Sequence, residues 1–232
     1  MARDFDGVDD RLVVGNTNIA TTGSSTTIVV HRPDNTAAAF QSVFTRSSIT
    51  DNGWRCDSRA GTNILGFTKQ GPGGADISST LALTQDSWYI LAWRHIEVTS
   101  VVFYRKLLTS TTIDSETVTN TNAISAPGTG TVIGSRTGDE AVALDGALSL
   151  ILHYNADIGD ALTQLILASN GAYVHSANLS LFMHLWGLST ESDWSGNNNH
   201  QSSVVGTTIL DHPAGIGAIW LAPHLRLVQG SA

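Results

Sequence analysis

The sequence has a single cysteine, few basic residues and no long apolar run. Cys56 alone cannot form an intrachain disulfide, so the fold cannot depend on one. The net charge is −8, which disfavours binding to nucleic acid or anionic lipid, because both require a cationic face. No stretch approaches the roughly 18 apolar residues of a membrane span, and the first residues, MARDFDG, contain no apolar signal segment. We therefore expect a protein made in the cytoplasm, with neither nucleic acid nor a membrane as partner.

Charged residues are also scarce, at 14% of the 232 residues. An ordinary globular chain has about a quarter. Ser, Thr, Asn and Gly supply the missing polarity, and these residues favour strands and turns. Long helices would need Glu, Lys and Arg on their solvent faces. The composition therefore predicts one all-β domain.

Short apolar runs recur along the chain and are separated by clusters of Gly, Asn, Asp, Ser and Pro. In residues 148–154 the Leu and Tyr side chains share one face, and Ser149 and His153 lie on the other, a period of two. Residues 88–108 predict two long strands joined by a tight turn near Glu97 to Ser100. The predicted strands are Thr26–Val30, Ala39–Phe44, Asn63–Thr68, Trp88–Glu97, Val101–Leu108 and Leu148–Tyr154. Such a density of strands is typical of a sandwich or barrel.

One helix is predicted over residues 160–170, with Asp160 as its cap, an apolar stripe that includes Leu165 and Ile166, and Gly171 as its stop. A second short helix is predicted over Leu179 to Leu185. Residues after Trp186 read as loop until the apolar tail Ile216 to Val228, which predicts either a last strand or an assembly arm.

Three segments in order resemble concanavalin A-like and laminin-G-like domains. FDGVDDRLVVG, at 5–15, is similar to their early strand motif, residues 87–108 to their central hairpin, and residues 132–171 to the strand and helix that follow. The resemblance covers residues 5 to 171. It implies an antiparallel two-sheet jelly-roll sandwich with one or two short helices, formed by residues 1–232 as one domain. Residues 172–232 would then be an extension that completes the sandwich or serves as an assembly arm.

A second resemblance lies in LWGLSTESDWSGNNNHQSSVVGTT, at 185–208, whose Asp-x-Ser-Gly-Asn-x-Asn core often opens such domains. Here it follows the helix and precedes Asp211-His212-Pro213. This order resembles domains of bacteriophage structural proteins. The resemblance implies a place on a virion, as a head-decoration, fibre or tail component, with other virion proteins as partners.

The residues required for catalysis are missing. Glucanases of the resembled fold carry Glu-x-Asp-x-Glu on one strand, so that alternate carboxylates enter the cleft, and no such triplet occurs. No Gly-x-Ser-x-Gly elbow and no His-x-x-x-His or Cys-x-x-Cys pair occurs either. We therefore expect no enzyme and no zinc site, with a glycoside hydrolase as a distant third reading.

Calcium is the one cofactor that the sequence leaves open. Asp193, Asn197 and Asn199 have the oxygen chemistry of a hard-cation site, as do three aspartates at 6, 9 and 10. The alternative is that these residues make turns, and for the early motif we expect an Asp that binds backbone N–H groups at the strand's entry.

Carbohydrate binding would use an exposed indole to stack on a sugar, with Asn side chains bonding its hydroxyls. Trp54 and Trp194 have polar, loop-like neighbours, and Asn197 and Asn199 lie close to the second. The other tryptophans, Trp88, Trp93, Trp186 and Trp220, have core-like neighbours.

Two hypotheses follow. The first is a non-catalytic virion structural protein that self-associates as a homo-oligomer, such as a trimer. The alternative is a lectin-like carbohydrate-binding module, and both functions can coexist on one particle.

Overall fold

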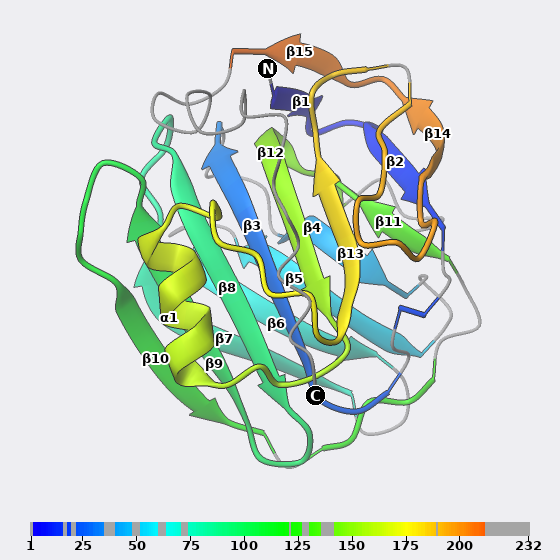
Figure 1. Cartoon of the computed structure of the whole chain (residues 1–232). Helices are drawn as coiled ribbons and strands as arrows, with labels where there is room; N and C mark the ends of the chain where they lie inside the picture. The colour runs from blue at the N-terminus through cyan, green and yellow to red at the C-terminus, as the bar shows by residue number, and fades with distance from the viewer. Residues whose placement is uncertain are drawn as a thin grey trace.

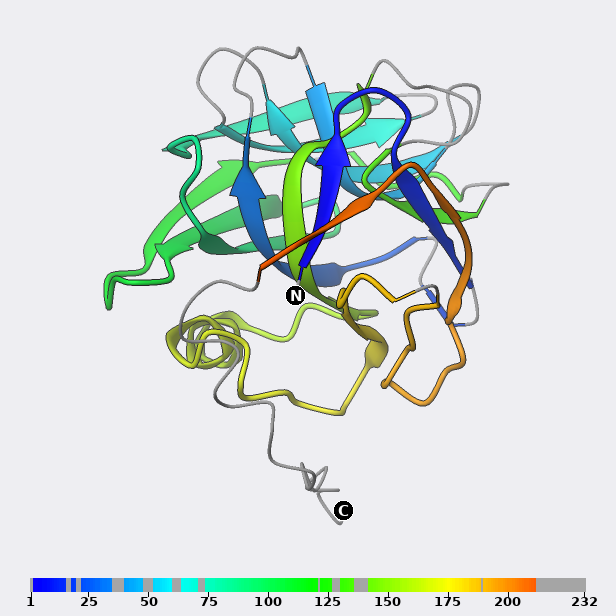
Figure 2. The same ribbon diagram turned by 90° about the horizontal axis from the view of Figure 1, so that it is seen from above.

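A computed structural model shows two β-sheets packed face to face with one short helix outside them (Figures 1 and 2). The structure describes residues 2–15, 18–19, 22–34, 40–47, 52–59, 64–70, 74–120, 122–126, 130–135, 142–188 and 190–211. The predicted fold class, an all-β antiparallel jelly-roll sandwich, is confirmed. The C-terminal tail Ile216–Val228, predicted as a strand or an arm, lies outside the described residues.

The chain crosses between the two sheets several times, and β4 to β7 follow one another in the same sheet. One sheet has eight strands in the order β10-β9-β8-β3-β12-β1-β15, with β13 beside β12, and the other has seven in the order β14-β2-β11-β4-β5-β6-β7. The bounds are β1 Ala2–Asp6, β2 Arg11–Val14, β3 Ser25–Pro33, β4 Phe40–Arg46, β5 Gly53–Arg59, β6 Ile64–Gln70, β7 Ala75–Ala82, β8 Tyr89–Ile96, β9 Ser100–Leu107, β10 Asp114–Thr119, β11 Thr131–Ile133, β12 Asp145–Tyr154, β13 Leu179–His184, β14 Gln201–Val205 and β15 Thr208–Leu210.

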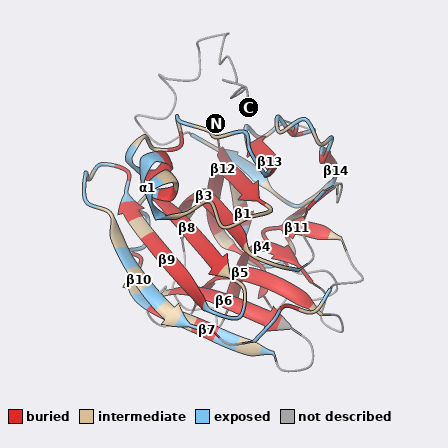
Figure 3. Cartoon of the chain, turned by 60° about the horizontal axis from the view of Figure 1, so that its bottom comes forward, coloured by how far each residue is buried: buried red, intermediate tan, exposed pale blue. Residues whose placement is uncertain are grey.

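The predicted central hairpin is present as β8 and β9, which pair in continuous register from Tyr89 opposite Leu107 to Ile96 opposite Ser100. All of β8 except its last residue is buried, because one face packs between the sheets and the other packs under the helix. Figure 3 shows the same burial along the central strands and its loss at the edge strand β10.

The core between the sheets is rich in aromatic rings as well as aliphatic side chains. Trp54 and Phe67 of the seven-stranded sheet meet Leu91, Trp93 and Phe103 of the eight-stranded sheet there. The Trp93 indole donates its N–H to the Gly66 carbonyl oxygen at 2.8 Å, so its polar atom is satisfied inside the core.

A second apolar cluster lies outside the eight-stranded sheet, under α1 (Asp160–Ala168). Ile166 and Leu167 are buried there, whereas Leu165 of the predicted stripe is 48% exposed. Gly159, rather than Asp160, is the N-cap residue, and Asp160 lies in the first turn. Gly171 ends the helix as predicted, since it adopts a φ of 79° and donates its N–H to the Ile166 oxygen.

The helix predicted over Leu179 to Leu185 is wrong, because these residues form β13, which pairs antiparallel with β12. Its Leu181 and Met183 face the core between the sheets, while Phe182 faces the cluster under α1. A strand buried on both faces has no alternation in its sequence, so its period cannot separate strand from helix. Residues after Trp186 are also not all loop, since β14 and β15 lie there.

The single apolar face predicted for residues 148–154 is broken by a bulge. The register of β12 against β3 shifts between Leu148 and Leu150. Leu148 therefore faces the core between the sheets together with Ile151, while Leu150 faces α1. Among the described residues, no helix has the length and apolar character needed to cross a membrane.

Candidate functional site

The segment after β13 runs from one sheet to the other at the edge of the sandwich and carries two tryptophans. It leaves β13 at His184, turns, and returns alongside the strand, where Asp193 forms an isolated bridge with Met183. The Trp194 amide donates to the Phe182 oxygen at 2.7 Å. The segment then enters β14, which pairs with β2 of the seven-stranded sheet. Residues 193–199 therefore cover the free edge of β13.

Asp193, predicted as a calcium ligand, fastens this segment. One carboxylate oxygen accepts the amide N–H groups of Phe182 at 3.0 Å and Ser195 at 2.9 Å. The other accepts the Ser195 hydroxyl at 2.8 Å and the Asn199 amide N–H at 2.9 Å. A cation at this carboxylate would have to displace these hydrogen bonds. The polar chemistry that indicated calcium is used here for a turn.

Asn197 and Asn199, predicted as sugar and metal ligands, also serve this turn. The Asn197 amide nitrogen donates to the Leu179 oxygen at 3.0 Å, and the Asn199 amide nitrogen donates to the Ser180 oxygen at 2.9 Å. Asn199 is fully buried. The structure therefore brings Asp193, Asn197 and Asn199 together, as the spacing predicted, but their side chains point into the protein.

Trp194 is directed outward by this arrangement and is 60% exposed. Trp186, which the sequence assigned to the core, is 36% exposed, so that assignment is corrected. The two indoles line one pocket of about 60 Å³. His184 sits behind them, with its ring centroid 5.7 Å from that of Trp186. The pocket is lined by His184, Trp186, Leu188, Glu191, Ser192 and Trp194.

Trp54, the other predicted sugar-stacking residue, lies in β5 and is 1% exposed. Its indole is enclosed by Phe44, Phe67 and His153 between the sheets. The loop-like setting predicted for Trp54 is therefore wrong, and its ring presents no face to a ligand. The polar residues Asp51 and Asn52 precede the strand, which made the setting look like a loop.

A buried ion pair holds the base of the pocket. Arg3 of β1 and Glu191, 4% and 1% exposed in their side chains, meet with Nε and Oε1 at 2.9 Å. The same Glu191 oxygen accepts the amide N–H groups of Gly187 at 2.7 Å and Leu188 at 3.1 Å. Arg3 also donates to the Leu188 carbonyl oxygen and, at 2.7 Å, to the Thr207 hydroxyl. The pair thus fixes the turn between the two indoles.

Gly187 completes this turn because it adopts a φ of 73° and packs against β15. A Cβ at this position would lie 2.5 Å from Cγ1 of Ile209. The turn and β15 therefore form one surface, on which Leu188 and Ile209 are 49% and 56% exposed.

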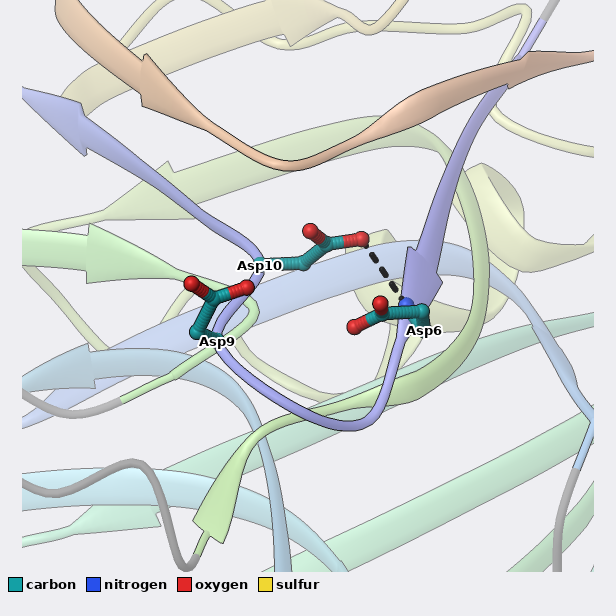
Figure 4. A group of neighbouring side chains, drawn as sticks. All are labelled: Asp6, Asp9 and Asp10. Carbon is teal, nitrogen blue, oxygen red and sulfur yellow. Dashed lines mark hydrogen bonds between the residues drawn. The ribbon is translucent and has the colours of Figure 1, made fainter.

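The three aspartates of the early motif lie together at the turn between β1 and β2 (Figure 4). Oxygen atoms of Asp6, Asp9 and Asp10 all lie within 4.8 Å of one another. Asp10 accepts the Asp6 amide N–H at 2.8 Å, and Asp6 accepts the Val8 amide N–H at 2.9 Å. Burial raises the pKa of Asp10 above its usual value. Two of the three carboxylates therefore close the turn, which is the role predicted for this motif.

Comparison with known proteins gives structural neighbours only. No family model and no curated protein matches the chain. A candidate carbohydrate-binding protein from Bacteroides ovatus superposes with a TM-score of 0.65 at 16% identity, over 91% of this chain and 60% of that one. This similarity shows that the two chains share a fold. The chain thus spans three-fifths of the length of this neighbour.

Two further neighbours have the same fold in other settings. A heptameric SAP-like pentraxin from Limulus polyphemus gives a TM-score of 0.52 at 18% identity, over 73% of this chain and 82% of that one. The enzymatically active domain of tailspike protein 2 of bacteriophage CBA120 gives 0.54 at 14% identity, over 75% of this chain and 28% of that one. At these identities the likeness extends to the sandwich and not to any side chain.

Sequence reasoning missed Trp186, Leu188 and Glu191. Trp186 lies between Leu185 and Gly187, next to a buried strand, so its neighbours indicated a core position. The spacing of the aromatic residues in LWGLSTESDW was the available signal, because two indoles eight residues apart can line one pocket when the chain turns back between them.

Proposed function

We propose that this chain is a non-catalytic carbohydrate-binding module whose ligand lies on Trp186 and Trp194. The carrying observation is the pair of exposed indoles around one pocket, fixed from below by the buried pair Arg3 and Glu191. Indole faces stack on the C–H faces of sugar rings, and a rigid indole loses little entropy on binding.

The construction of the segment supports this proposal. The side chains of Asp193, Asn197 and Asn199 bond to the β13 backbone or within the turn, so they hold the segment that carries Trp194 against β13. An exposed tryptophan on a rigid support is a costly arrangement for a surface that only faces water, whereas it is the usual arrangement of a recognition site. The neighbour from Bacteroides ovatus, described as carbohydrate-binding, adds weight to this class of ligand.

The test is a glycan array with the purified chain and a Trp194→Ala variant. We expect the chain to bind a subset of glycans and the variant to lose at least tenfold in affinity for them. Tyr173→Ala is the matched control, because Tyr173 is 42% exposed and is not among the residues that line the pocket. Equal binding by the chain and by Trp194→Ala would show that the ligand does not lie on this surface. Binding to no glycan on the array would contradict the proposed function.

A virion structural role is the second candidate, and it is compatible with sugar binding. Its support is the order of segments after α1, which resembles phage structural proteins, together with a tailspike among the structural neighbours. Under this proposal the chain self-associates as a homo-oligomer, such as a trimer, and binds other virion proteins. Light scattering on the purified chain and co-sedimentation with particles test it. A monomer that stays in the supernatant would leave only the carbohydrate-binding proposal.

A further inference from the structure

The pocket lined by Trp186 and Trp194 is small compared with a sugar ring. Its volume is about 60 Å³, and a single water needs roughly 10–15 Å³ on a comparable measure. The pocket therefore accepts a group of a few heavy atoms and not a sugar ring. A ring stacked on an indole would lie at the mouth and direct one substituent inward.

The lining of the pocket selects the chemistry of that substituent. Trp186, Leu188 and Trp194, whose side chains are mostly carbon, are among its lining residues, which favours an apolar group such as a methyl. Ser192 is also a lining residue, and a serine hydroxyl can both donate and accept a hydrogen bond. A substituent that combines a methyl group with a hydrogen-bond donor and acceptor matches both the apolar lining residues and Ser192.

Charge excludes the ionised alternatives. Glu191 lies at the pocket, but Arg3 balances its charge, so a carboxylate substituent would find no unpaired cation there. The cation beside it, Arg3, is already bound to Glu191, Thr207 and the Leu188 oxygen. An ammonium group is disfavoured for the same reason, since Glu191 is already paired with Arg3 at 2.9 Å and offers no unpaired anion.

We propose that the pocket binds the acetamido group of an N-acetylated hexosamine, with its methyl between Trp186 and Trp194 and its amide at Ser192. This inference rests on the proposed carbohydrate-binding function and names the ligand class of the same site. The sugar ring stacks on the exposed face of Trp194, and the acetamido group provides the selectivity.

Calorimetric titration with methyl glycosides of N-acetylglucosamine, N-acetylgalactosamine and the parent hexoses tests this assignment. We expect at least one N-acetylated sugar to bind about tenfold more tightly than its parent hexose. Ser192→Ala and Leu188→Ser should each reduce this preference several-fold. Both residues are exposed, so the variants should keep the melting temperature of the parent chain. Tyr173→Ala should change neither preference nor stability.

The outcomes that contradict the assignment are as follows. Equal affinity for N-acetylated and parent sugars, or a preference for uronic acids or glucosamine, would overturn the acetamido assignment and leave the carbohydrate-binding function standing. A preference that survives both Ser192→Ala and Leu188→Ser would also overturn it. Binding of choline, included as a quaternary ammonium probe, without binding of any sugar would overturn both proposals.

Discussion

The imidazole of His153 stacks on the indole of Trp54 inside the sandwich, with ring centroids 5.0 Å apart and an interplanar angle of 19°. The stack continues from Trp54 to Phe67 and from Phe67 to His95, at interplanar angles of 12° and 11°. Two imidazoles thus end a row of rings that runs through the core. Both histidines are fully buried, and each hydrogen-bonds within the protein, His153 to Thr27 and His95 to the Gly23 oxygen.

This burial predicts acid sensitivity. Desolvation lowers the pKa of His153 to about 3 and the pKa values of His31 and His95 to about 4. In the unfolded chain these groups bind protons near pH 6.5. Stability is therefore fully present above about pH 6.5 and falls as the pH drops toward 4, by about 1.4 kcal/mol per pH unit for each imidazole. Urea unfolding at several pH values between 7.5 and 5 measures this slope.

The matched variant is His153→Phe, which keeps a ring in the stack and removes one titrating group. Buried carboxyls with raised pKa values, such as those of Asp57 and Asp10, change stability with pH in the opposite direction. The parent chain and the variant share these carboxyls, so their effect cancels in the comparison. The slope of the variant should be lower by about 1.4 kcal/mol per pH unit. Identical slopes would mean that His153 takes up no extra proton on unfolding, so that its pKa is not lowered in the native state.

The two tryptophans predicted as sugar-binding should differ sharply in their effect on stability. Trp54→Ala removes a ring that is 1% exposed and should lower the free energy of unfolding by about 3–5 kcal/mol. Trp194→Ala removes a ring that is 60% exposed and should change it by less than about 0.5 kcal/mol. Chemical denaturation of both variants checks this. A large loss for Trp194→Ala would place its ring in the packing and weaken its assignment to the ligand.

The sandwich could be predicted from the sequence because most of its strands alternate or are bounded by turns. The hairpin of β8 and β9 is the clearest case. β13 could not be predicted, since Leu181 and Phe182 face two different apolar clusters and the alternation disappears. The short edge strand β14 is polar on most of its positions and reads as loop. An alternating sequence pattern identifies a strand only when one face is buried and the other is exposed. β13 and β14 lack this pattern, so only their tertiary partners show that they are strands.

The site was predicted in part for the same reason. The turn-forming residues from Asp193 to Asn199 were correctly grouped, because their spacing is local. Whether each side chain points inward or outward depends on contacts with residues that are distant in the sequence. Glu191 looks like a solvated carboxylate in the sequence, and its burial depends on Arg3, which is 188 positions away. Trp54 and Trp194 have similar polar neighbours, yet one is in the core and the other at the surface.

The pair Arg3 and Glu191 should show strong energetic coupling. Glu191→Gln leaves the Arg3 charge buried without its partner, and Arg3→Met does the same to Glu191, so each should cost about 3–5 kcal/mol. The double variant removes both charges and keeps an oxygen for the Gly187 and Leu188 amides. It should therefore lose clearly less than the sum, with a coupling of about 1–3 kcal/mol. Additive losses in a denaturation cycle would show that the two charges are stabilised separately.

Calcium should leave the melting temperature unchanged, because the oxygens of Asp193 already accept hydrogen bonds from Phe182, Ser195 and Asn199, which a cation would have to displace. Scanning fluorimetry in excess calcium and in excess chelator tests this. Should calcium raise the melting temperature, two variants locate the ion. Loss of the shift in Asp9→Asn would place it among Asp6, Asp9 and Asp10, since the hydrogen bonds that close this turn use the other two carboxylates. Loss of the shift in Asp193→Asn alone would place it at the β13 edge and would show that the turn there rearranges around the ion.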